Sequence, residues 1–257
     1  MVEMNHIDRE KVKQAFASYT AGYNSDDPKI KLKIDHTYRV AELCDMISET
    51  VRGADRDLAW LCGMLHDVGR FEQVKRYNTF ADAKSVDHAQ FGADFLFNEK
   101  LVDSFGTFCD EWKDILEVSI RNHNKFKIDE GLSDEYLEYC QILRDADKID
   151  ILRVNIDTPP EEIYNVSSEN LRRSAVSDAV KQGFREKHAI LRSLRQTPAD
   201  IMVGHICMVN ELVYPISIRI AREQGYLATL LEFDSENVDT NEWFAFMRAT
   251  LRKEGFI

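Results

Sequence analysis

Six side chains that can bind a divalent metal occur in one ordered series along this chain. Four of its seven histidines and two aspartates form the series, in the order His36, His66, Asp67, His88, His123 and Asp147. Imidazole and carboxylate groups are the ligands that hard and borderline divalent metals prefer. A structural zinc site needs only four ligands, so six are better explained by two metal ions.

The segments that carry this series show helical periodicity. Apolar residues recur at helical spacing in five of them, at residues 28–51, 55–67, 85–96, 112–122 and 134–154. Strand signals are nearly absent, with no Asn-Gly or Asp-Gly hairpin turn between alternating apolar runs. The sequence therefore predicts an all-α protein in which helices bring the six side chains together, as in bundles whose metal ligands project inward.

The residues at the helix ends refine this expectation. Gly69 is expected to end the second helix, because glycine accepts the left-handed conformation common at that position. Ser85 and Asp87 can cap the third helix, which places His88 in its first turn. The linking residues 69–80 are rich in aromatic and basic side chains and are expected to form a lid or specificity loop.

The clearest break in the chain is Thr158-Pro159-Pro160. It predicts two parts: residues 1–157, with an N-terminal helix and the metal-binding core, and residues 158–257, a C-terminal helical lobe packed on the core. Helices are expected in the lobe at residues 177–193, 198–210, 214–225 and 241–253. The lobe is expected either to close the pocket or to form a homodimer.

Composition and charge restrict the class of protein. The 257 residues are 44% hydrophobic and 30% charged, which is typical of a globular domain. The net charge of −12 argues against a nucleic-acid-binding surface, although a small phosphorylated substrate needs only a few local cations.

Targeting and redox signals point to one compartment. No stretch approaches the roughly 18 apolar residues of a membrane span, and the N-terminus lacks the order of a signal peptide. The five cysteines are odd in number and dispersed, which indicates reduced, buried thiols. We therefore expect a cytoplasmic protein with neither membrane nor nucleic-acid partners.

The residues around His66 and Asp67 carry a family resemblance. The run Ala59-Trp60-Leu61-Cys62-Gly63-Met64-Leu65-His66-Asp67-Val68-Gly69-Arg70 is an apolar helix that ends in a polar pair and a glycine. It resembles the signature of the HD-domain metal-dependent phosphohydrolase superfamily. The other members are similar to the family in order and context: His36-Thr37-Tyr38, Asp87-His88-Ala89, Asn122-His123-Asn124 and Ala146-Asp147-Lys148. The resemblance covers roughly residues 30–155.

This resemblance implies an HD-domain helical bundle with a binuclear metal centre. Simple family members need only the equivalents of His36, His66, Asp67 and Asp147, which would hold one ion. The additional His88 and His123 imply a second ion, held together with a bridging Asp67. Both ions are expected to be divalent transition metals, namely Fe, Mn, Co, Ni or Zn, because mixed nitrogen and oxygen ligands suit all of them.

The activity that the resemblance implies is hydrolysis of a phosphate ester, in a nucleotide or another small phosphorylated metabolite. Two ions roughly 3.5–4 Å apart can generate a bridging hydroxide and neutralise charge on the phosphoryl group. Asp67 would bridge the ions and orient the nucleophile, and Arg70 and Lys148 are the cations expected near the phosphate. Lys84 and Arg121 are weaker candidates.

Other interpretations stay open at this point. A few HD-domain proteins use the same six ligands to hold two irons that oxidise a C–H bond, and a non-catalytic nucleotide-sensing module is a third hypothesis. Taken alone, His88 and His123 could be structural histidines near helix ends. Asp145 and Asp150 flank Asp147 and are expected to be surface or supporting carboxylates. His6, His188 and His205 lie outside the series and are expected not to bind metal.

Overall fold

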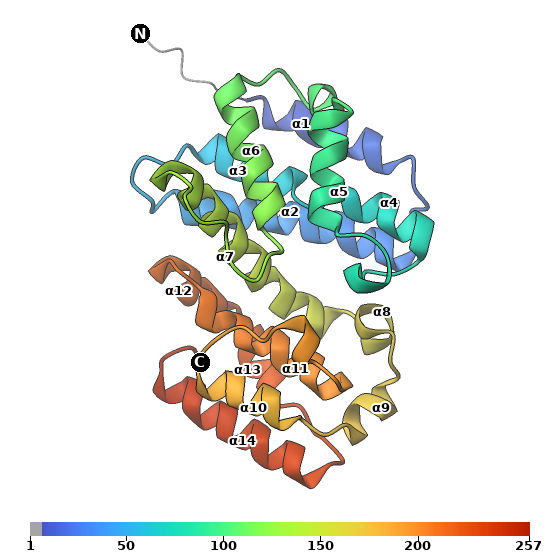
Figure 1. Cartoon of the computed structure of the whole chain (residues 1–257), viewed down its shortest axis with the longest axis vertical. Coiled ribbons are helices and arrows are strands. Elements are labelled where there is room, and N and C mark those ends of the chain that lie inside the picture. The colour runs from blue at the N-terminus through green and yellow to red at the C-terminus, as the bar shows by residue number, and fades with distance from the viewer. Residues whose placement is uncertain (1–6) are drawn as a thin grey trace. The chain divides into compact units, whose positions relative to one another are not determined.

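The computed structural model describes residues 7–257, and within this range it contains helices and no strand (Figure 1). The predicted all-α class is confirmed. The chain forms two compact units, one up to Ala146 and one from Asp147 onward, so their boundary lies inside a helix. The division expected after residue 157 stays a prediction; that helix ends at Asp157.

The first unit carries most of the metal-binding series. Its elements are α1 (Arg9–Thr20), α2 (Pro28–Ser48), α3 (Arg56–Leu65), α4 (Val68–Tyr77), η1 (Asp82–Lys84), α5 (His88–Ala93), η2 (Asp94–Asn98), η3 (Leu101–Ser104), α6 (Asp110–Asn122) and the first part of α7 (Asp134–Asp157). Aspartates accept hydrogen bonds from backbone amides at the starts of α2, α3 and α5, as the sequence predicts for Asp87.

The second unit consists of the rest of α7 and the C-terminal helices. These are α8 (Pro160–Tyr164), α9 (Ser168–Arg173), α10 (Asp178–Arg185), η4 (Arg192–Leu194), α11 (Pro198–Ile206), η5 (Cys207–Glu211), α12 (Pro215–Gln224), α13 (Tyr226–Leu231) and α14 (Val238–Lys253). The predicted lobe helices are confirmed, three of them with shorter bounds (α10, α11 and α12), whereas α14 begins three residues earlier than predicted. Helices α8, α9 and α13 lie outside the predicted segments.

Two close helix contacts depend on glycine. A Cβ atom at Gly63 of α3 would lie 2.5 Å from the Ala41 Cα of α2, and one at Gly69 of α4 would lie 2.4 Å from the His88 carbonyl oxygen of α5. Both distances are well below a normal carbon contact, so any larger residue would separate the helices. The first contact brings α3 onto the helix that carries His36, and the second brings α4 onto the residue His88 itself.

Gly69 therefore has a different role from the one predicted. It does not end a helix in the left-handed conformation but lies in the first turn of α4, against Gly92 of α5. The expected loop at residues 69–80 is also wrong over most of its length, because α4 continues to Tyr77 and ends at a left-handed Asn78. Only the residues after Asn78 connect to α5 without a regular α-helix.

The structure also tests the expectations for the cysteines and for membrane-spanning helices. All five cysteines are free thiols; four are buried, whereas Cys109 is exposed, contrary to the expected core position. Among residues 7–257, the helices are too short or too polar to cross a membrane.

Candidate metal centre

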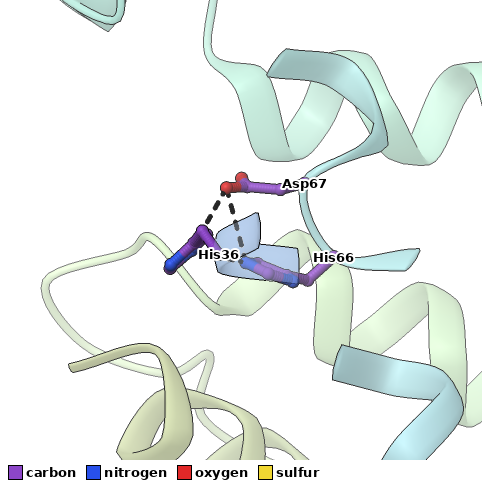
Figure 2. Close-up of side chains that lie close together, drawn as sticks. All are labelled: His36, His66 and Asp67. Atoms are coloured by element: carbon purple, nitrogen blue, oxygen red, sulfur yellow. Dashed lines mark hydrogen bonds and ion pairs between the residues drawn. The ribbon is translucent and has the colours of Figure 1, made fainter. Parts of the chain in front are cut away.

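Five of the six predicted ligands converge inside the first unit. His36 lies in the middle of α2, His66 and Asp67 connect α3 to α4, His88 begins α5, and His123 directly follows α6. All five side chains are buried. Figure 2 shows the His36, His66 and Asp67 side chains pointing toward one another. Residues that lie up to 87 positions apart in the sequence, from 36 to 123, thus form one polar cluster in an apolar core.

The Asp67 carboxylate lies between two pairs of histidines. Its Oδ2 atom is 3.5 Å from His36 Nε2 and 3.4 Å from His66 Nε2. Its Oδ1 atom is 3.4 Å from His88 Nε2 and 3.7 Å from His123 Nε2. Each carboxylate oxygen therefore faces one pair, which is the arrangement that a carboxylate shared by two cations requires.

We call His36 and His66 the first pair, and His88 and His123 the second pair. Hydrogen bonds at the Nδ1 atoms set the orientation of the second pair. His88 Nδ1 lies 2.9 Å from Asp82 Oδ2, and His123 Nδ1 lies 2.7 Å from the Ile120 carbonyl oxygen. Both partners only accept hydrogen bonds, so each Nδ1 carries a proton, and in its neutral form such a ring has a lone pair on Nε2. The two Nε2 atoms are 3.0 Å apart. Two facing lone pairs repel, and a cation that both nitrogens bind removes this repulsion.

The first pair is arranged in a similar way. His66 Nδ1 donates to the Gly63 carbonyl oxygen over 2.7 Å, so its Nε2 points at the His36 Nε2 atom 3.3 Å away. Asp67 Oδ1 is buried and has no hydrogen-bond partner among residues 7–257. A buried carboxylate oxygen without a donor is costly unless a cation compensates it. The donor set, the converging Nε2 atoms and this oxygen all fit divalent metal ions.

The electrostatics keep these groups in the forms that bind metals. Burial opposes ionisation of Asp67, but the nearby Lys33 charge holds its pKa well below the usual range. Burial, together with the nearby Arg70 charge, lowers the pKa of His88 to about 3. Near neutral pH the site therefore offers an ionised carboxylate and a neutral His88 imidazole.

Lys33 is a member of this site that sequence reasoning missed. Its Nζ atom lies 2.7 Å from Asp67 Oδ2, and its side chain is only 13% exposed. The available signal was its position three residues before His36, which places both residues on one face of α2.

Asp82 supports the second pair from outside. It accepts hydrogen bonds from His88 Nδ1, from Arg70 over 2.9 Å and from Gln73 over 3.0 Å. Burial opposes its ionisation, but the His88 hydrogen bond and the Arg70 charge keep the pKa of Asp82 below its usual range. A carboxylate behind a ligand histidine fixes the ring and raises its basicity.

Arg70, predicted to lie near a phosphate, is buried and forms hydrogen bonds within the protein. It is 9% exposed, and its Nη1 atom donates to Gln73, to the Phe80 carbonyl oxygen and to Asp82. These contacts tie the segment after α4 to the site. Arg70 Nε remains 3.7 Å from Asp67 Oδ1, so the guanidinium charge still lies beside the cluster. A direct contact of Arg70 with substrate stays a prediction.

Arg144 holds the segment that follows α6. Its Nη1 atom donates to the carbonyl oxygens of Asn122, His123 and Lys125, over 2.9, 3.3 and 2.5 Å. These carbonyls lie at the C-terminal end of α6, where helix carbonyls lack partners. Arg144 therefore positions the backbone of His123, a role that no sequence pattern indicated.

The remaining predicted residues have separate outcomes. Asp147 and Lys148 lie on α7 in the second unit, where Lys148 Nζ donates to the Glu211 carbonyl oxygen over 3.2 Å. Their places at the metal and the phosphate stay predictions. Lys84 is exposed, and Arg121 forms ion pairs with Asp94 and Glu117.

Of the histidines expected not to bind metal, two can be described. His188 and His205 both lie in the second unit, and His205 Nδ1 contacts Asn155 Oδ1 at 3.0 Å. His6 lies outside the described residues.

Comparison with known proteins agrees with this geometry. Residues 34–152 match the model of the HD domain family. No match was found among curated proteins or among solved structures. The matched range contains all six predicted ligands, and HD-domain proteins are generally metal-dependent phosphohydrolases. The chain therefore contains an HD domain, and its residues 34–152 belong to that family.

Proposed function

We propose that this protein hydrolyses a phosphate ester, in a nucleotide or another small phosphorylated metabolite, with two divalent transition metal ions. The observation that carries the proposal is the division of the Asp67 carboxylate between two histidine pairs. A single ion held by His36 and His66 would not explain why His88 and His123 converge, or why the buried Oδ1 atom has no hydrogen-bond partner among residues 7–257.

The donor set assigns each ion to one half of the site. His36, His66 and Asp67 Oδ2 would hold one ion. Asp147 would join them, as the family resemblance implies. His88, His123 and Asp67 Oδ1 would hold the other. When bound, such ions supply an activated water and neutralise negative charge that builds on a phosphoryl group.

The protein's own residues prepare the site for this chemistry. The Nδ1 hydrogen bonds of His66, His88 and His123 hold the three Nε2 atoms in place before any ion arrives. Lys33 and Arg70 add positive charge beside Asp67, which favours an anionic substrate. The cytoplasmic location inferred from the sequence is part of this proposal.

Metal analysis and ester hydrolysis test the proposal together. Protein purified anaerobically is analysed for metals, then assayed on chromogenic phosphate monoesters and diesters before and after chelation and metal return. We expect about two ions per chain and hydrolysis that disappears on chelation and on Asp67→Ala. Asp35→Asn, an exposed carboxylate on the same helix as His36, is the matched control and should keep both properties.

The same experiment separates the competing chemistry. Two bound irons with oxygen uptake and no ester hydrolysis would replace this proposal with the di-iron oxygenase hypothesis. An Asp67→Ala variant that folds and keeps full biological function would favour the non-catalytic sensing module instead.

A further inference from the structure

We propose that Lys33 is a built-in counter-ion that takes the place of a metal charge in the metal-free site and competes with one ion for Asp67. The inference rests on the proposed binuclear centre and adds a residue that sets its metal affinity. Its basis is the contact between Lys33 Nζ and Asp67 Oδ2, at 2.7 Å.

The Lys33 ammonium group lies at the His36–His66 half of the site. Asp67 Oδ2, which Lys33 contacts, is the oxygen that faces His36 and His66, at 3.5 and 3.4 Å. Lys33 and His36 lie on one face of α2, one turn apart. The ammonium and an ion bound by this pair would therefore share one carboxylate oxygen.

The other half of the site has a more distant counter-ion, the Arg70 guanidinium. Asp67 Oδ1 has no hydrogen-bond partner among residues 7–257, and the nearest guanidinium atom, Arg70 Nε, is 3.7 Å away. Arg70 uses its Nη1 atom on Asp82, Gln73 and Phe80. One carboxylate oxygen is thus in direct contact with a lysine, whereas the other has a guanidinium nearby but no hydrogen bond.

The Lys33–Asp67 pair is largely sheltered from water. The two side chains are 13% and 2% exposed, and the Phe80 ring lies 5.4 Å from Lys33 Nζ. Breaking a sheltered ion pair by removing one partner leaves an uncompensated charge and is strongly destabilising. The lysine should therefore stabilise the metal-free protein, and a divalent ion entering the His36–His66 half must displace or repel the ammonium.

Metal titration of Lys33→Met tests this competition. Chelated protein is titrated with Mn²⁺ by calorimetry, and thermal unfolding of the metal-free form is measured beside it. Loss of the ammonium should lower the Tm of the metal-free protein and tighten one of the two Mn²⁺ sites by about tenfold or more. Lys31→Met, an exposed lysine on the same helix, should change neither value.

A charge-preserving variant and the wild type make the result decisive. Lys33→Arg should keep the metal-free Tm and the Mn²⁺ affinity close to wild type. This variant can be measured even if Lys33→Met does not fold without metal. Mn²⁺ binding by Lys33→Met that is equal to or weaker than wild type would overturn the competition and leave the proposed function standing. Wild-type protein that binds neither Mn²⁺, Co²⁺ nor Zn²⁺ would instead overturn the metal centre itself.

Discussion

The two histidine pairs around Asp67 are stabilised by different means. The His36–His66 pair lies where α2 and α3 meet at Gly63, and its shared carboxylate oxygen is already paired with Lys33. The His88–His123 pair lies at the ends of two other helices, and its shared carboxylate oxygen has no hydrogen-bond partner among the described residues. In one half a lysine donates directly to the carboxylate oxygen, and in the other the nearest cationic atom, Arg70 Nε, lies 3.7 Å from it.

The two pairs also differ in the groups that hold their histidines in place. His66 relies on a carbonyl of its own helix, Gly63. His88 relies on Asp82, which is itself held by Arg70 and Gln73, and the backbone of His123 relies on Arg144. Charged side chains therefore hold the ring of His88 and the backbone of His123, whereas a backbone carbonyl holds the ring of His66. We expect the two halves to respond differently to substitution.

Replacing one histidine of either pair should have the largest effect on metal content and activity. His36→Ala and His88→Ala should each lower the metal content by about one ion per chain, because each leaves one half with too few ligands. Ester hydrolysis should fall by roughly a hundredfold or more in both, since both ions contribute to the reaction. Elemental analysis beside a chromogenic ester assay measures both effects. A variant that keeps two ions would show that its histidine is structural.

Asp82→Asn should affect only one half. Loss of the carboxylate behind a ligand histidine commonly weakens metal binding by roughly 10–100-fold. We expect this change for one of two Mn²⁺ binding events in calorimetry, with the other unchanged. Asp94→Asn, an exposed carboxylate paired with Arg121, is the control. Equal weakening of both events would mean that Asp82 supports the fold rather than His88.

Arg144→Met should lower stability and disturb the same half. Its guanidinium is buried and donates to carbonyls at the C-terminal end of α6 and just after it, so its loss removes these hydrogen bonds. We expect a loss of about 2 kcal/mol in urea unfolding of the metal-free protein. Arg52→Met, at an exposed arginine, should leave stability unchanged. Unchanged stability of Arg144→Met would remove its assigned role.

The metal-free protein should lose stability in mild acid because of His88. Its pKa lies near 3 in the folded state, below that of an unfolded histidine, so the unfolded chain binds the extra proton. Stability from this group is fully present above about pH 6.5 and falls as the pH is lowered toward 3. Between pH 7 and 5.5 the expected loss is about 1 kcal/mol. Urea unfolding of His88→Gln should show a flatter pH profile than wild type.

Much of the architecture was readable from the sequence. Apolar periodicity placed the helices that became α2, α3, α6 and α7, and an aspartate cap placed the start of α5 at His88. The ligand series was indicated by residue type and order, together with the similarity of its surroundings to the HD-domain family. Five of its six members are indeed brought together.

The supporting residues were decided by the tertiary structure. Lys33 contacts Asp67 across 34 positions, and Arg144 contacts Asn122 across 22. Gly69 proved to be a contact between helices rather than a helix end. Periodicity tells which face of a helix is buried, but it does not tell which residue of another helix that face will meet. The predicted ligands could therefore be named from the sequence, whereas their hydrogen-bond and charge partners depended on how the helices cross.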